Sequence, residues 1–218
     1  MSWGDVRTEE RRDLTEPLIE GSGRIKQDIW APVFSHPPRA SLEMSIEIDV
    51  LDGNQSWPIA EPLFNAVWPP QVVAKLPWAE IVFANAELRV LLQSETGEAV
   101  CHIGIYRRDI KWNGRRMRAG GVGGVLTRKD SRGKGYATLA LSAAIQTLKD
   151  EGSTDFALLF CEPHNAPFYV DRGWKPFEGE IYAEQPPGRV RFDAIAPYVY
   201  DFRRAPRQGT IDLCGLPW

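Results

Sequence analysis

Between residues 122 and 149 the spacing of the apolar residues changes from that of a strand to that of a helix. This change limits the folds that the chain can adopt more than any other feature. Residues 122–127 form a short strand-like run, and a glycine-containing loop follows them. Apolar residues then recur at helical spacing, and Gly152 offers a C-terminal stop after Lys149. The segment therefore predicts a strand, a tight loop and an amphipathic helix that packs on a sheet.

Other segments carry strand and helix signals of their own. Asn113-Gly114 lies between two strand-like runs, which is the strongest short signal of a hairpin. We predict an α/β (α+β) fold, with a mixed, mostly antiparallel central sheet flanked by helices. The further predicted strands are 45–51, 88–93, 99–106, 156–161, 181–183 and 198–202, and the further helices are 57–67 and 165–171, the second capped by Asn165.

The length of 218 residues exceeds one ordinary domain of about 150 residues without reaching two. Residues 1–42 are polar and contain several glycines and prolines, so we predict that they form an N-terminal extension. Residues 43–218 are predicted to form a single domain.

Composition argues against several classes of partner. Lys and Arg number 26 against 29 Asp and Glu, so the net charge of −3 does not favour a nucleic-acid surface. No apolar run reaches the roughly 18 residues that could span a membrane, and residues 1–13 lack the apolar centre of a secretory signal. Cys101, Cys161 and Cys214 lie far apart, so we expect no metal site, no disulfide framework and a cytoplasmic location.

The loop between the strand and the helix predicts an anion site. Gly133 and Gly135 let the backbone approach a ligand, the following helix presents free N–H groups, and Arg132 and Lys134 add positive charge. A plain tight turn would also account for the glycines. Two common nucleotide-binding patterns fail, because Gly135 stands where one needs Ser or Thr and Thr138 where the other needs Gly.

The pattern R-x-x-G-x-A does fit, at Arg132, Gly135 and Ala137. Together with the segment 165–174 it resembles the GNAT superfamily of acyl-CoA-dependent N-acetyltransferases. Within that superfamily the chain is most similar to the aminoglycoside 2′-N-acetyltransferases, through Arg107-Arg108, the run 169–174 and a final Trp. A weaker similarity links it to the rhizobial nodulation acyltransferases.

The resemblance implies an enzyme that uses acetyl-CoA and transfers its acetyl group directly to an amine. The pantetheine arm would lie along residues 122–127, whose backbone N–H groups would polarise the thioester carbonyl. Tyr169 would be the catalytic general acid toward the leaving thiolate, although it could instead serve only to anchor its helix. The implied cofactor-binding residues are Val125, Leu126, Thr127, Arg132, Gly133, Lys134, Gly135, Tyr136, Ala137 and Asn165.

The general base is where the chain departs from the family pattern. The aminoglycoside enzymes carry a glutamate on the cofactor strand, at the position of Gly123. Glu162 and His164 follow the strand 156–161 and could replace that glutamate, directly or through water, with Glu162 the preferred catalytic residue. A merely solvated turn would explain these two residues equally well.

The resemblance implies a small-molecule amine as acceptor, with an aminoglycoside-like amino sugar as the leading candidate, and allows a homodimer. The alternatives are a longer-chain acyltransferase of nodulation type and a non-catalytic acyl-CoA-binding sensor, which Gly123 keeps open. Most of the eight tryptophans lie outside the motif region, which predicts an aromatic-lined acceptor site. These tryptophans are Trp3, Trp30, Trp57, Trp68, Trp78, Trp112 and Trp218.

Overall fold

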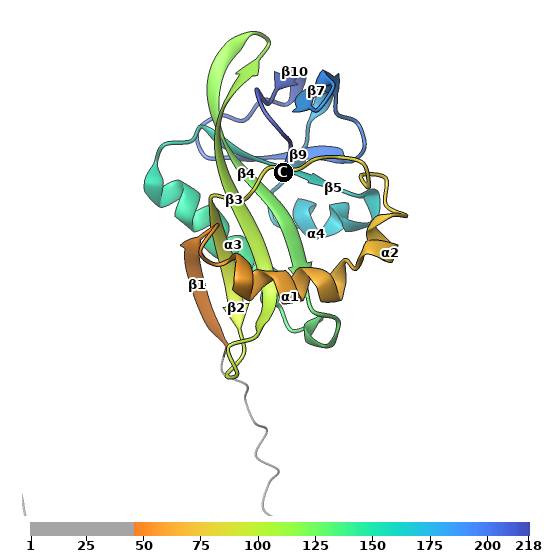
Figure 1. Ribbon diagram of the computed structural model, residues 1–218. Helices are drawn as coiled ribbons and strands as arrows, with labels where there is room; N and C mark the ends of the chain where they lie inside the picture. The colour runs from red at the N-terminus through yellow and green to blue at the C-terminus, as the bar shows by residue number, and fades with distance from the viewer. Residues whose placement is uncertain (1–45) are drawn as a thin grey trace, which may run out of the picture. The chain divides into compact units, whose positions relative to one another are not determined.

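Ten strands form one sheet in the computed structural model, which describes residues 46–218 (Figure 1). The predicted extension over residues 1–42 lies outside the described residues. The strands are β1 Glu47–Asp52, β2 Leu88–Gln93, β3 Ala99–Trp112, β4 Arg115–Thr127, β5 Phe156–Cys161, β6 Lys175–Pro176, β7 Glu178–Gln185, β8 Gly188–Arg191, β9 Ala196–Asp201 and β10 Gln208–Asp212. The helices are α1 Trp57–Val67, α2 Pro70–Val73, α3 Tyr136–Glu151 and α4 Ala166–Val170, with 3-10 turns η1 Lys129–Ser131 and η2 Pro163–Asn165.

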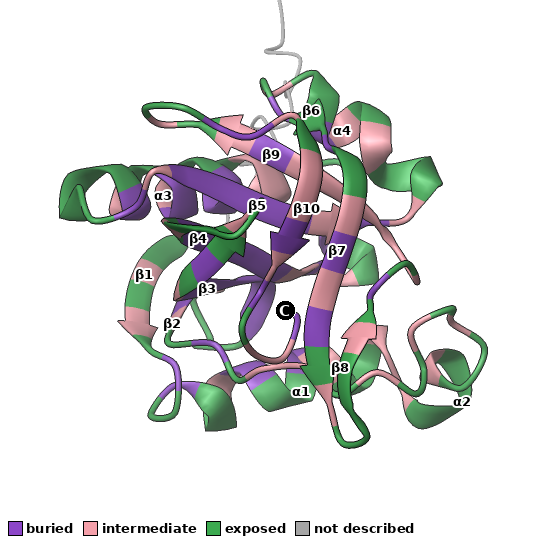
Figure 2. Ribbon diagram, turned by 90° about the horizontal axis from the view of Figure 1, so that it is seen from above, coloured by how far each residue is buried: buried purple, intermediate pink, exposed green. Residues whose placement is uncertain are grey.

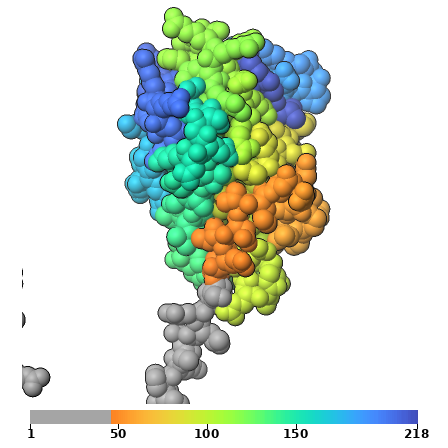
Figure 3. All heavy atoms as spheres, turned by 90° about the vertical axis from the view of Figure 1, so that its left-hand side faces the viewer, coloured from red at the N-terminus to blue at the C-terminus, as the bar shows by residue number. Residues whose placement is uncertain are grey.

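The long hairpin of β3 and β4 forms the centre of the sheet. β2 and β4 pair antiparallel with β3, and β5 pairs parallel with β4. Asn113 and Gly114 at its turn have φ angles of 46° and 78°, as a two-residue turn between twisted strands requires, so the predicted hairpin is confirmed. The closed end of the β3–β4 hairpin projects beyond the helices in Figures 1 and 3.

Side chains that alternate along β2 enter two separate layers. Val90 and Leu92 pack on the face covered by α3, whereas Leu91 packs with Leu63 on the face covered by α1. Figure 1 shows α1 in front of the central strands and α3 behind them. β5 is buried along almost its whole length (Figure 2), as its continuous apolar run predicts. The predicted fold class is confirmed.

β4 and β5 separate part-way along their length. Their parallel pairing covers only residues 119–122 of β4, although β4 continues to Thr127. Gly124 has a φ of +58°, and the pairing of β3 with β4 shifts register beside it, which marks a β-bulge. Residues 123–127 therefore have no partner in β5, and their backbone forms an open strand edge.

The structure differs from the sequence-based expectations at the Asn165 cap and in three strands that were not predicted, β6, β8 and β10. Asn165 precedes α4, but its side chain makes no capping hydrogen bond, because the 3-10 turn Pro163–Asn165 already leads into the helix. β10 was not predicted, since it depends on partners far along the chain: it pairs parallel with β7 and antiparallel with β3. No helix in the described part of the chain is long and apolar enough to cross a membrane.

Candidate active site

A cavity of about 390 Å³ opens where β4 and β5 separate. Its wall combines the segment that holds α1 and α2, residues 123–125 of β4, the end of β5 with α4, and Trp218. Of the residues predicted to be catalytic or to bind the cofactor, four line this cavity: Val125, Glu162, Asn165 and Tyr169. Elements distant in the sequence thus bring the predicted catalytic residues to the open edge of β4.

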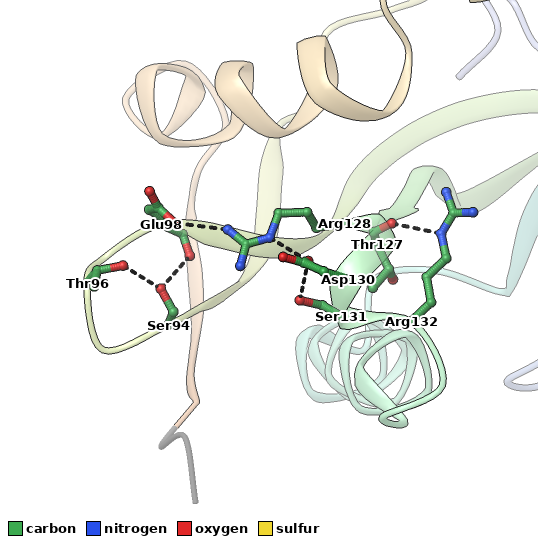
Figure 4. A network of polar contacts seen from close by, with 8 residues as sticks. All are labelled: Ser94, Thr96, Glu98, Thr127, Arg128, Asp130, Ser131 and Arg132. Carbon is green, nitrogen blue, oxygen red and sulfur yellow. Dashed lines mark hydrogen bonds and ion pairs between the residues drawn. The ribbon is translucent and has the colours of Figure 1, made fainter. Parts of the chain in front are cut away.

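The loop from β4 to α3 is fixed at its start by ion pairs (Figure 4). Arg128 contacts Glu98 at 2.9 Å and Asp130 at 2.8 Å, and both acidic partners are largely exposed. The Nε of Arg132 donates a hydrogen bond to the carbonyl of Thr127 at 3.2 Å. These contacts set the path of the loop before its glycines.

The rest of this loop leaves backbone groups free for a ligand. Within the described residues, the amides of Gly133, Lys134 and Gly135 donate no hydrogen bond. Gly133 and Gly135 have φ angles of +77° and +82°, and a Cβ on either would meet no atom within 4 Å. The first turn of α3 adds its own unpaired N–H groups and the positive end of its dipole. This combination is suited to a phosphate or pyrophosphate.

Tyr169 reaches the cavity from α4 and is only 6% exposed. Its hydroxyl makes no hydrogen bond within the described residues. Burial raises the pKa of this phenol above its ordinary value, and the nearby thiols of Cys161 and Cys101 raise it further. Tyr169 therefore holds a proton at neutral pH and has a free donor at the cavity.

Glu162 and His164, the two candidate bases, differ in their position. Glu162 lines the cavity, and its Oε1 accepts a hydrogen bond from Nε1 of Trp78 at 3.4 Å. The other oxygen, Oε2, lies 3.5 Å from Nδ1 of His164. The side chain of His164 is 70% exposed and does not line the cavity. Glu162 is thus the one of the two that can meet a substrate directly.

Trp218 explains why residues 121 and 123 are glycines. A Cβ on Gly123 would lie 2.9 Å from the main-chain carbonyl carbon of Trp218, and a Cβ on Gly121 would overlap its indole. The indole is held in place, because its Nε1 donates to the carbonyl of Leu158 at 3.0 Å and the ring stacks on Tyr106. A glutamate at position 123 does not fit while Trp218 occupies this place.

Aromatic rings cover the wall of the cavity formed by the segment that holds α1 and α2. Five rings follow one another with centroid separations of 5.2 to 5.8 Å, mostly edge to face. They belong to Trp57, Phe64, Trp68, Trp78 and Phe83.

The predicted aromatic lining applies to four of the seven tryptophans named above. Trp57, Trp68, Trp78 and Trp218 line the cavity. Trp112 does not: its Nε1 donates to the carbonyl of Gln208 at 2.9 Å near the hairpin end. Trp3 and Trp30 lie outside the described residues.

Arg89 is a cavity residue that sequence analysis missed. Its Nη1 donates to Nε2 of His102 at 2.8 Å, and the other ring nitrogen, Nδ1, then donates to the carbonyl of Gly124 at 2.7 Å. Burial lowers the pKa of His102 to about 3, and the charge of Arg89 acts in the same direction, so the imidazole is neutral. A single arginine in an apolar strand does not by itself indicate a functional site. Its position becomes informative only in the folded chain, where His102 lies against it.

The remaining predicted cofactor residues lie along the strand edge and the loop, outside the cavity. Leu126 is buried beneath α1, so only its backbone is available. The Oγ1 of Thr127 donates to Sγ of Cys101 at 3.3 Å. Tyr136 and Ala137 are half-buried at the start of α3, and Lys134 is exposed. Among the described residues, no group of three His, Cys, Asp or Glu side chains could hold a metal ion.

A family model described as the acetyltransferase (GNAT) domain matches residues 59–177, which is more than half of the chain. The chain belongs to the GNAT family. The match includes the β4 edge, the phosphate-type loop and Tyr169, so the site described above lies inside the GNAT domain.

A curated relative agrees with this membership. The chain is 30% identical over 95 residues to an aminoglycoside 2′-N-acetyltransferase of Mycolicibacterium fortuitum. That match covers 44% of this chain and 48% of the relative, so the chain spans about half the length of the curated relative it matches.

Two solved structures show the same fold. The GNAT family N-acetyltransferase YhbS of Escherichia coli, in complex with CoA, has a TM-score of 0.54 at 13% identity and covers 78% of this chain and 91% of its own. Escherichia coli ElaA has a TM-score of 0.52 at 16% identity and covers 72% of this chain and 100% of its own.

Proposed function

We propose that the protein is an acetyl-CoA-dependent N-acetyltransferase that acts on a small amine by direct attack on the thioester. The observation that carries the proposal is the open edge of β4 beside Tyr169, whose hydroxyl has no hydrogen-bond partner within the described residues. Family membership and the neighbour solved with CoA support the same activity. The three cysteines are free, which supports a cytoplasmic location.

The residues present fit acetyl-CoA at three points. The backbone of residues 123–127 offers the hydrogen bonds of an unpaired strand edge to the pantetheine amides. The free amides of residues 133–135, with Arg132 and Lys134, suit the pyrophosphate. Asn165 is exposed, lines the cavity and makes no capping bond, so its amide is free to contact the pantetheine arm.

The chemistry that acetyl-CoA supplies is an acetyl group activated as a thioester. Backbone N–H groups between Gly124 and Leu126 would stabilise negative charge on the thioester oxygen, since they are fixed beside the bulge before reaction. Tyr169 would donate its proton to the departing sulfur, for which its raised pKa keeps it protonated. Glu162 would accept the proton that the attacking amine loses, directly or through one water.

The acceptor is proposed only as a small amine. The name of the Mycolicibacterium fortuitum relative suggests an amino sugar, but the match covers about half of that protein. Gly123, at the position of the family glutamate, favours a second candidate function, an acyl-CoA-binding sensor without turnover. A longer acyl-CoA is the alternative donor. One assay decides both whether the protein turns over and which acyl length it uses.

That assay is thiol release from acetyl-CoA and from longer acyl-CoA esters, measured with a panel of primary amines. We expect amine-dependent release with wild type and a loss of about 100-fold or more in kcat for Tyr169→Phe, with acetyl-CoA affinity little changed. Tyr200→Phe is the control, since Tyr200 is a half-buried tyrosine outside the cavity. Acetyl-CoA binding without release for any amine would favour the sensor. An unchanged kcat in Tyr169→Phe would remove Tyr169 from its role.

A further inference from the structure

Arg89 is a buried cation without an anionic partner among the described residues. It is 7% exposed, lines the cavity, and forms no ion pair with any described carboxylate. Burial lowers the pKa of this guanidinium, and among the described residues the phenol of Tyr106 is the one group that raises it. An arginine in such a place normally has a carboxylate beside it, because a buried unpaired charge is costly.

Other arginines of the chain illustrate the contrast. Arg107 pairs with Glu87 at 3.0 Å and also with Glu151. Arg128 and Arg189 likewise contact carboxylates, although their side chains are more exposed than that of Arg107. Arg89 combines this lack of a described carboxylate partner with a side chain that is only 7% exposed and lines the cavity.

The contacts of Arg89 fix part of its guanidinium and leave donors unused. Nε donates to the carbonyl of Gly53 at 2.9 Å, and Nη1 donates to His102 at 2.8 Å. The guanidinium also lies over the ring of Trp57, with Cζ 4.9 Å from the ring centroid. A guanidinium has five N–H donors, and Nη2 has no acceptor within the described residues. The side chain is thus held in position with a donor edge free at the cavity wall.

The remaining wall of the cavity restricts what could pair with Arg89. Among the described residues that line it, two side chains carry charge, Arg89 and Glu162, and nine of the other nineteen residues are aromatic. The single positive charge of Arg89 would be neutralised by one carboxylate of a ligand. A phosphate dianion would bring a second negative charge with no cation to pair with it.

From this juxtaposition we propose that the acetyl acceptor is an amine that also carries a carboxylate on an aromatic or alkyl body. The carboxylate would pair with Arg89, the body would lie against the rings of Trp57 and Phe64, and the amine would lie toward Glu162 and the edge of β4. This inference rests on the proposed function and narrows its acceptor class.

The test compares two probes of equal shape, 3-phenylpropanoate and 3-phenylpropanamide, titrated calorimetrically into the full chain. We expect wild type to bind the carboxylate at least about tenfold more tightly than the amide, the gain of a charge-assisted hydrogen bond. Arg89→Gln should bring the ratio close to one, whereas Arg89→Lys should retain part of the preference. Arg108→Gln is the matched control, because Arg108 is partly buried but does not line the cavity, and it should keep the wild-type ratio.

Three results would overturn the proposal: equal affinities in wild type, no binding of either probe up to about 10 mM, or a preference that survives Arg89→Gln. The wild-type ratio decides even if a variant fails to fold, since it needs no substitution. A parallel titration with acetyl-CoA separates the two claims. If wild type does not bind acetyl-CoA, the proposed function is wrong. The ratio of the affinities for 3-phenylpropanoate and 3-phenylpropanamide tests the carboxylate site and is measured without acetyl-CoA.

Discussion

His102 has no exposed surface and connects Arg89 to the bulge at Gly124. Because burial lowers its pKa from 6.5 to about 3, the unfolded chain binds a proton between these values and the folded chain does not. Protons therefore favour unfolding in this window. The free energy of unfolding should fall as the pH drops below 6.5, by at most about 1.4 kcal/mol per pH unit from this residue.

Urea unfolding at pH 7, 6 and 5 measures this dependence. His102→Gln should show a shallower pH slope than wild type, together with a lower free energy of unfolding at pH 7. His164→Gln is the control, since the side chain of His164 is 70% exposed, and it should keep the wild-type slope. Equal slopes for His102→Gln and wild type would show that the folded state binds this proton as readily as the unfolded chain.

Gly121 and Trp218 form a second residue-scale pair. A methyl group at position 121 would overlap the indole, which is held by the carbonyl of Leu158 and by stacking on Tyr106. We expect Gly121→Ala to lower the free energy of unfolding by about 1–3 kcal/mol, as overpacking does.

A double-mutant cycle with Trp218→Ala isolates the cause. In the Trp218→Ala background the added methyl group should cost much less, because the indole it meets is gone. Denaturant unfolding of the four proteins gives the coupling energy. Additive effects of the two substitutions would mean that the clash is not with Trp218.

At the scale of elements, the loop between β4 and α3 carries the predicted phosphate site. Gly133 and Gly97 share a φ of +77°, and a Cβ on either would meet no atom within 4 Å. Valine at either position should destabilise the fold by about 1–2 kcal/mol through the same left-handed strain. Only Gly133→Val places a side chain beside the free amides, so it alone should weaken acetyl-CoA binding, by about tenfold or more.

Calorimetric titration with acetyl-CoA and thermal unfolding measure the two effects separately. Gly97→Val should reproduce the loss of stability without the loss of affinity, because Gly97 lies in the turn between β2 and β3. If both variants bind acetyl-CoA as wild type does, the loop is not the phosphate site.

Elements with strong local signals could be predicted from the sequence, and elements held by distant partners could not. Asn113-Gly114 specifies its hairpin because both residues tolerate positive φ, and α1 was predicted at its observed bounds, Trp57–Val67. β10 depends on β3 and β7, which no local pattern reveals.

The same distinction applies to the site. Tyr169 and Val125 could be selected through motif spacing and do line the cavity. Arg89 could not, because its importance depends on burial and on His102, which folding brings to it from another strand. The position of Trp218 over Gly123 is likewise a property of the folded chain.

For the whole molecule, the parts converge on one region. The separation of β4 from β5 opens a strand edge, the loop before α3 leaves amides free, and the aromatic segment around α1 covers the other wall of the cavity. Arg89, inside the matched GNAT domain, and Trp218, beyond its last matched residue, line the same cavity.

The central claim, that this edge and loop bind acetyl-CoA, is tested most directly by isothermal titration of the full chain with acetyl-CoA. The structure predicts saturable binding of one acetyl-CoA per chain with a Kd in the micromolar range, about −8 kcal/mol, weakened about tenfold or more by Gly133→Val but not by Gly97→Val. Absence of binding at tens of micromolar acetyl-CoA, about the concentration at which such a Kd saturates, would contradict it.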